Sequence, residues 1–141
     1  MTSPAGALAL WTAEGARALL VPLGTVFERH GERLSHPGGF VAVVDADCTV
    51  LTPALLLLGA LAAVGALARL GWRRTLAFAF GGIVVLAIAN QLRLAAVLWT
   101  GANAPLHFAW LHDVAGPLWL VAVGTVIVQR AVRGGAAPGA A

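Results

Sequence analysis

Four long apolar stretches, separated by short polar segments, constrain this chain more than any other feature of its sequence. They cover residues 5–27, 49–68, 75–99 and 111–128 of the 141. Each approaches or exceeds the roughly 20 residues that an α-helix needs to cross a bilayer. Only 11% of the residues are charged, whereas a soluble domain carries about 25%. We therefore predict an all-α fold, a polytopic transmembrane bundle of about four helices. It forms one transmembrane domain, residues 1–133, followed by a disordered tail, residues 134–141.

The first stretch differs from the others because it contains two charges, Glu14 and Arg17, three residues apart on one helical face. A charge at the centre of a bilayer costs about 2.5–3.5 kcal/mol on insertion scales unless it is paired or turned inward. We predict a spanning helix, and the alternative is an amphipathic helix in the membrane interface. No Lys or Arg occurs between Met1 and Leu10, so we expect no cleavable signal peptide.

Two connections interrupt the apolar stretches on the same side of the predicted bundle. Before the second helix, a polar run at residues 28–37 is followed by a Gly-Gly pair and by a short β-branched run at residues 40–44. Because the glycines break a helix, we expect a short extracytoplasmic loop here with an extended stretch at 40–44. A second loop is expected at residues 100–105.

The distribution of arginine gives the chain an orientation. Three Arg lie in the connection at residues 69–74 and two follow the last stretch, whereas the loop at residues 28–47 has two Arg among four acids. The positive-inside rule counts Lys and Arg alone, so the 69–74 connection and the C-terminus are predicted to be cytoplasmic. All nine basic residues are Arg, mostly at the ends of apolar runs. This pattern favours a lipid bilayer as partner and argues against nucleic acid.

Three chemically versatile residues from separate segments are predicted to lie at one depth. Cys48, the only cysteine, begins the second helix, and His112 begins the last one. Arg93 is about 18 residues into the third helix, which places it ~27 Å from the cytoplasmic end at ~1.5 Å per residue. Each has an ordinary explanation alone, as a buried thiol, a snorkelling arginine or a solvated histidine. Their common depth near the outer surface makes them a candidate site.

The motifs around these residues resemble the exosortase/archaeosortase family of polytopic membrane cysteine proteases and presumed transpeptidases. Cys48 opens an apolar helix, Asn90-Gln-Leu-Arg93 lies within a later one, and His112-Asp113-Val-Ala-Gly opens the last. The resemblance implies Cys48, Arg93 and His112 as catalytic residues. It also implies a substrate, an exported protein that ends in a short motif, a transmembrane helix and a basic cluster. The implied location is the cytoplasmic membrane, with the active site facing the extracytoplasmic side.

The chemistry of these residue types agrees with that implication. A thiol becomes a good nucleophile once it is ionised, and a nearby His or Arg lowers its pKa. His112 is then the general base and later the acid, whereas Arg93 keeps its proton and stabilises a thiolate or an oxyanion. Asn90 is predicted to position Arg93 or substrate. Asp113 is included as a supporting residue, although adjacent side chains on a helix are expected to point apart.

Two other functional classes remain open on the sequence. The residues after Cys48 are Thr49-Val50, where the family usually has a small polar residue and then Gly, and many members carry additional helices before the core. Both departures favour a non-catalytic assembly or scaffold subunit of the same fold, or a minimal core that relies on a membrane partner or on a second copy of itself. A small transporter or channel subunit using Arg93 is a further alternative. We expect neither a metal site nor a cofactor.

Overall fold

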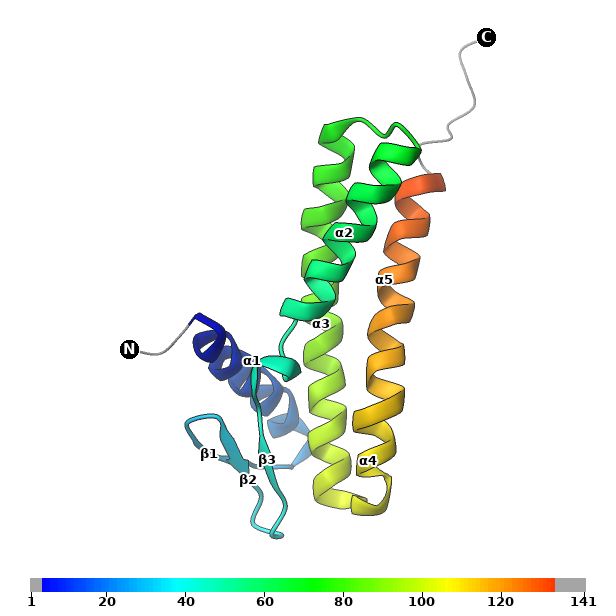
Figure 1. The fold of residues 1–141 in the computed structure, drawn as a ribbon. Coiled ribbons are helices and arrows are strands. Elements are labelled where there is room, and N and C mark those ends of the chain that lie inside the picture. The colour runs from blue at the N-terminus through cyan, green and yellow to red at the C-terminus, as the bar shows by residue number, and fades with distance from the viewer. Residues whose placement is uncertain (1–3, 134–141) are drawn as a thin grey trace.

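The structure, a computed structural model, describes residues 4–133 as a tall helical bundle with a small β-sheet beside one end (Figure 1). The helices are α1 (Pro4–Leu20), α2 (Leu51–Leu67), α3 (Trp72–Asn103), α4 (Phe108–Trp110) and α5 (Gly116–Arg133). The antiparallel sheet has the strand order β1 (Glu28–His30), β2 (Arg33–Ser35), β3 (Val41–Val43). A 3₁₀ turn at Ala46–Cys48 precedes α2, and a 3₁₀ turn at Pro105–His107 and a π-helical turn at Leu111–Ala115 flank α4.

The long helix α3 is the axis of the fold, because two buried clusters form on successive parts of it. The three-helix cluster joins α2, α3 and α5 through Leu57, Leu61, Ala79, Leu86, Ala89, Leu120 and Ala131. The sheet-side cluster joins the C-terminal part of α3 to α1, the sheet and the turn before α2. Its members are Ala13, Ala16, Leu20, Phe27, Leu34, Val44, Cys48, Leu94, Ala95 and Leu98. The junction of the two clusters therefore falls at residues 90–93 of α3.

The outer surface of the three-helix part is apolar, as expected for helices that face lipid. Leu55, Leu56 and Phe80 are 61%, 69% and 76% exposed. Two helical segments are long and apolar enough to cross a membrane, Trp72–Asn103 and the nearly continuous Pro105–Arg133, and the apolar α2 is shorter at 17 residues. The prediction of an all-α membrane helix bundle is confirmed.

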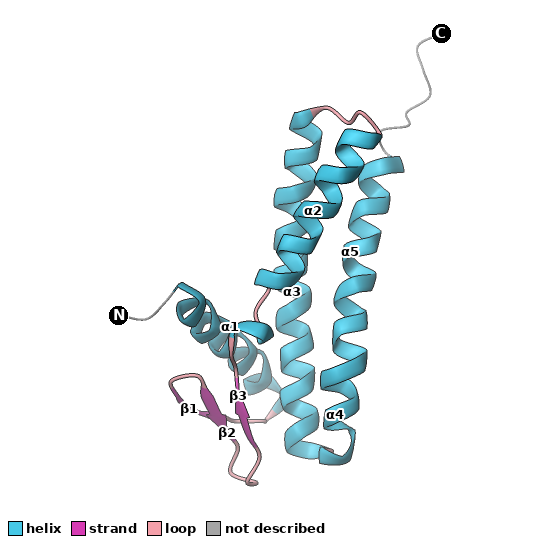
Figure 2. Ribbon diagram, in the orientation of Figure 1, coloured by secondary structure: helices cyan, strands magenta, loops and turns pink. Residues whose placement is uncertain are grey.

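The two ends of the bundle differ in their connections (Figure 2). The α2–α3 connection and the C-terminal end of α5 lie at one end, and the sheet and α4 lie towards the other (Figure 1). The arginine-rich segments at 69–74 and 130–133 thus share an end, as the charge distribution predicted.

The first helix packs on the sheet-side half of the molecule. Ala13, Ala16 and Leu20 belong to the cluster that includes Leu94 and Leu98 of α3. Its Glu14 carboxylate pairs with Arg17 on the same helix and with Arg29 Nε of β1, at 3.2 Å. The two charges predicted to be costly in a membrane are therefore satisfied by each other and by the sheet. As far as the structure describes it, from Pro4 to Leu20, α1 is not among the helices long and apolar enough to span.

Two connections differ from their predicted form. The extended stretch at 40–44 is present as β3, but the polar run at 28–37 also forms strands, β1 and β2, rather than an irregular loop. The loop predicted at 100–105 is wrong, because α3 continues to Asn103. The helix ends where Ala104 (φ −144°) precedes Pro105, since a proline disfavours helical geometry in the residue before it. The tail at 134–141 lies outside the described residues.

Candidate active site

The turn that carries Cys48 is held by hydrogen bonds from its own neighbours. Asp45 Oδ1 accepts from the backbone N–H groups of Asp47 and Cys48, at 3.1 and 3.2 Å. Thr49 Oγ1 donates to the Ala46 carbonyl at 2.7 Å. An aspartate at the start of a helical turn satisfies N–H groups that otherwise lack partners. Asp45 was not singled out in the sequence, although an Asp three residues before Cys48 is a recognisable capping signal.

The two residues after Cys48 fit this turn without glycine. Thr49 is extended (φ −87°, ψ 169°) and Val50 is helical (φ −74°, ψ −4°), so both have negative φ. Thr49 is 1% exposed, and its hydroxyl oxygen also accepts from Leu51 N–H at 3.3 Å, at the start of α2. The Thr49-Val50 pair thus stabilises the start of α2, and the backbone at these positions requires no special freedom.

Asn90 joins α3 to the Cys48 turn. Its Nδ2 donates to the Cys48 carbonyl oxygen at 2.9 Å, and the residue is 1% exposed. Its Oδ1 is buried without a hydrogen-bond partner among the described residues. A buried polar side chain that reaches across 42 positions of sequence fixes where the turn sits against α3.

Arg93 reaches from the next turn of α3 to the segment that carries His112. Its guanidinium donates to the His112 carbonyl oxygen at 3.4 Å, which is a long hydrogen bond. Arg93 Nε lies against Gly116, where a Cβ atom would approach it to 2.5 Å, and has no hydrogen-bond partner in residues 4–133. A cavity of about 180 Å³ adjoins it, lined by Leu92, Arg93, Ala96, Leu111, Ala115, Gly116 and Trp119.

His112 and Asp113 form a close pair. His112 Nδ1 and Asp113 Oδ1 are 2.6 Å apart. Because an ionised carboxylate only accepts hydrogen bonds, Nδ1 is the donor of this pair, and in the neutral imidazole Nε2 then has the free lone pair. The expectation that Asp113 points away from His112 is therefore wrong. Both residues lie in the π-helical turn Leu111–Ala115, whose additional residue per turn brings successive side chains closer in direction than an α-helix does.

The environment of Cys48 disfavours ionisation of its thiol. The residue lies outside α2 and is 9% exposed. Burial raises the pKa of the Cys48 thiol above its ordinary value, and the Asp45 carboxylate adds to this, while a hydrogen bond to the Asp45 backbone and the Arg93 guanidinium act in the opposite direction. The net direction is opposite to the lowering expected from a nearby His and Arg.

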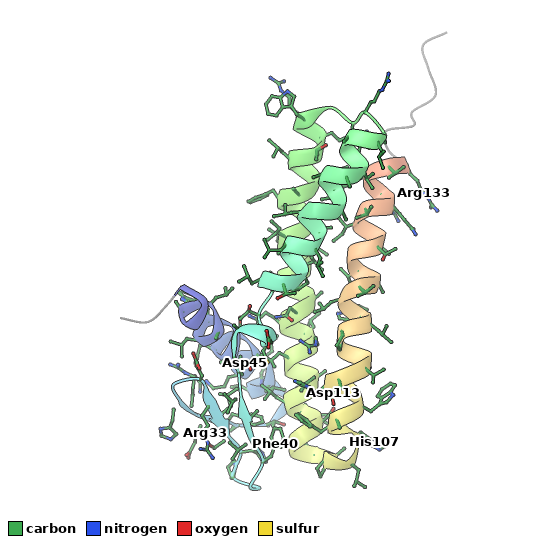
Figure 3. All side chains as sticks on the ribbon, in the orientation of Figure 1. Arg33, Phe40, Asp45, His107, Asp113 and Arg133 are labelled. Atoms are coloured by element: carbon green, nitrogen blue, oxygen red, sulfur yellow. The ribbon has the colours of Figure 1, made fainter. Side chains whose placement is uncertain are left out.

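The structure connects Cys48 and His112 through residues of α3 rather than through a direct contact between their side chains. Asn90 holds Cys48, and Arg93, one turn further, holds the backbone of His112. Within residues 4–133, no hydrogen bond links the Cys48 sulfur to the His112 ring or to the Arg93 guanidinium. Figure 3 shows Asp113 and Phe40 towards one end of the bundle and Arg133 at the other. The site is therefore near the end opposite the cytoplasmic arginines of the predicted orientation.

A comparison with protein families adds the decisive observation. The model of the transmembrane exosortase family matches residues 1–128 of the chain. The chain belongs to the transmembrane exosortase family. No match appears among curated proteins or among solved structures. Membership, together with the two spanning-length helices, makes this exosortase a membrane protein with an exosortase-type function.

Proposed function

We propose that this exosortase is a membrane-embedded cysteine peptidase or transpeptidase. It cleaves C-terminal sorting signals of exported proteins at the outer face of the cytoplasmic membrane, through a thioester acyl-enzyme. One observation carries the proposal: α3 binds the Cys48 turn through Asn90 and the His112 segment through Arg93. Three separate parts of the chain are thereby held at one level of the bundle.

The proposed reaction follows from the chemistry of these residue types. His112 Nε2 takes the Cys48 thiol proton as the sulfur attacks the substrate carbonyl carbon. The C–N bond then breaks, His112 returns the proton to the leaving amine, and the acyl group remains on sulfur. Water or an amine then attacks the thioester and releases the thiol. Since burial raises the pKa of the Cys48 thiol, the proposed reaction depends on His112 rather than on a preformed thiolate. Asp113 keeps Nε2 free for this task.

Arg93 is proposed to stabilise the oxyanion of the tetrahedral intermediate. Its Nε is buried without a hydrogen-bond partner among the described residues. The Arg93 side chain is one of those that line the cavity between α3 and the π-helical turn. A guanidinium N–H left unpaired in a buried place is available to a carbonyl oxygen of a bound peptide.

The lengths of the helices support a placement in the membrane. From Trp72, the 18 to 21 residues up to Asn90 and Arg93 rise ~27–32 Å, which equals the thickness of the hydrocarbon core. We infer that the outer membrane boundary lies near the candidate site. The sheet and α1 then lie at or beyond the boundary, which favours the interfacial alternative for α1.

The orientation is tested by cysteine labelling in a Cys48→Ala background. An impermeant thiol reagent applied from outside should label His30→Cys directly, and should label Arg73→Cys only after permeabilisation. The reverse pattern would contradict the orientation.

The activity is tested with a tagged secreted protein that ends in an apolar helix and a basic cluster. We expect wild type to shorten it, and Cys48→Ala and Cys48→Ser to leave it intact and to trap no thioester. Arg93→Lys should slow processing because lysine lacks the planar fork, whereas Arg130→Lys, at the exposed opposite end, is the matched control. Unchanged processing by folded Cys48→Ala would overturn the proposal.

The alternative is a catalytically inactive assembly subunit, and one observation favours it. Burial of Cys48 and the raised pKa of its thiol are typical of a structural cysteine. The two functions differ in one measurement. A peptidase loses processing when His112 becomes Gln, whereas an assembly subunit supports sorting equally well with His112→Gln or Cys48→Ala.

A further inference from the structure

A row of aromatic rings connects the β-sheet to His112. The Phe27 ring lies 5.3 Å from the His36 ring and 6.3 Å from the Phe40 ring, between ring centroids. The Phe40 ring lies 5.2 Å from Phe108, and the Phe108 ring lies 5.5 Å from His112. The row thus runs from the sheet to the candidate general base, and no step of the proposed reaction uses it.

Phe40 is fixed at the centre of this row by two independent contacts. Its ring meets Phe27, which is 1% exposed, with an edge-on geometry at 79°. The ring also lies against Gly101 of α3, so closely that a Cβ atom at Gly101 would overlap it. Gly101 is buried and helical, and its missing side chain leaves the space that Phe40 occupies. The ring therefore has one place against the sheet-side cluster.

Phe108 transmits this placement to His112. The two residues are four apart, where side chains meet on one face of a helical segment. Their rings are nearly parallel, at 21°, whereas Phe40 meets Phe108 at 64°. Asp113 holds one edge of the imidazole through Nδ1, but a single hydrogen bond leaves the ring free to turn about it. A ring stacked on its face removes that freedom.

We propose that Phe40 is a positioning residue for His112, acting through Phe108, so that the sheet sets the orientation of the imidazole. Its importance for catalysis rests on the proposed function of His112. The restraint on the ring itself does not, so it can be measured whether or not the protein cleaves a substrate.

The experiment follows the His112 ring by NMR in the full chain, in nanodiscs with ¹³C-labelled histidine, with signals assigned through His112→Gln. Phe40→Leu removes a ring that does not touch His112, so a change in the His112 ring-proton shifts must pass through Phe108. We expect the shifts to move towards those of an unstacked histidine, and Phe40→Tyr to retain the wild-type shifts. Phe80→Leu is the matched control, because Phe80 lies on the lipid-facing surface, 76% exposed.

A second variant covers the possibility that Phe40→Leu fails to fold. Gly101→Ala displaces the same ring from α3 and should move the same His112 signals, with a single cooperative thermal unfolding transition as the criterion of folding. In the processing assay, kcat should fall roughly tenfold or more with little change in KM, since small misplacements of a reacting group have effects of this size. Unchanged His112 shifts in folded Phe40→Leu or Gly101→Ala would overturn the proposal. If the His112 shifts change in these variants but the wild-type protein processes no substrate, the positioning role of Phe40 is upheld and the peptidase function is refuted.

Discussion

The hydrogen bond from Asn90 to the Cys48 carbonyl is the contact most open to a quantitative test. Replacement of Asn90 by Ala removes the donor and leaves a carbonyl oxygen of a buried residue without its partner. Such a loss costs about 1–3 kcal/mol. The variant also removes the buried Asn90 Oδ1, which has no hydrogen-bond partner within residues 4–133, and this relief offsets part of the cost. We expect about 1–2 kcal/mol, which multiplies the open population of the turn by about 5 to 30.

The chain itself supplies the assay, because Cys48 is its only cysteine. Cys48 is 9% exposed, so alkylation by a maleimide at fixed pH reports how often the turn opens. Asn90→Ala should raise the rate by the same factor as the open population. Asn103→Ala is the matched control: it lies on the same helix, but Asn103 is exposed and bonds only the Trp99 carbonyl four residues earlier. An unchanged alkylation rate in folded Asn90→Ala would show that Asn90 does not hold the turn.

Three further predictions concern packing and protonation. Gly82→Val should destabilise the bundle by about 1–3 kcal/mol, because the new Cβ would lie within 3.0 Å of side chains from two neighbouring helices. Gly81→Val is the control and should not destabilise it, because a Cβ at Gly81 meets open space. The thermal unfolding temperatures of the two variants test this difference. Asp113→Asn should lower kcat of the processing reaction about tenfold, since the imidazole loses a charge-assisted hydrogen bond. An unchanged pH–rate profile would refute the role of Asp113 as the partner of His112. The rate of Cys48 alkylation should reach half its maximum at a pH above the ordinary thiol pKa, because burial disfavours the thiolate; a midpoint below it would contradict the structure.

The sequence predicts the helices well because lipid imposes a length and a composition on them. It also predicts that Cys48, Arg93 and His112 share a level, since helical rise converts sequence position into depth. The strands β1 and β2 escape prediction because their residues are mostly polar, and only Leu34 is buried there. What stabilises them is packing against α1 and α3, which no local propensity encodes.

The pairing of His112 with Asp113 escapes prediction for a related reason. It depends on a π-helical turn, and such a turn arises from packing rather than from local residue preference. The direction of the Cys48 pKa is equally non-local. The sequence predicts that an arginine and a histidine lie at the same depth, but it does not predict how much apolar surface from α1 and the sheet covers the sulfur.

The division of buried residues into two clusters along α3 has a consequence for how the protein opens. Clusters of this kind unfold as separate cooperative units when few contacts cross between them. The sheet-side unit would detach from the end of α3 while α2, α3 and α5 remain paired. Hydrogen exchange would then show two free energies of opening within one chain of 141 residues. Because Cys48 belongs to the sheet-side unit, opening of that unit would expose the sulfur without any separation of α2, α3 and α5.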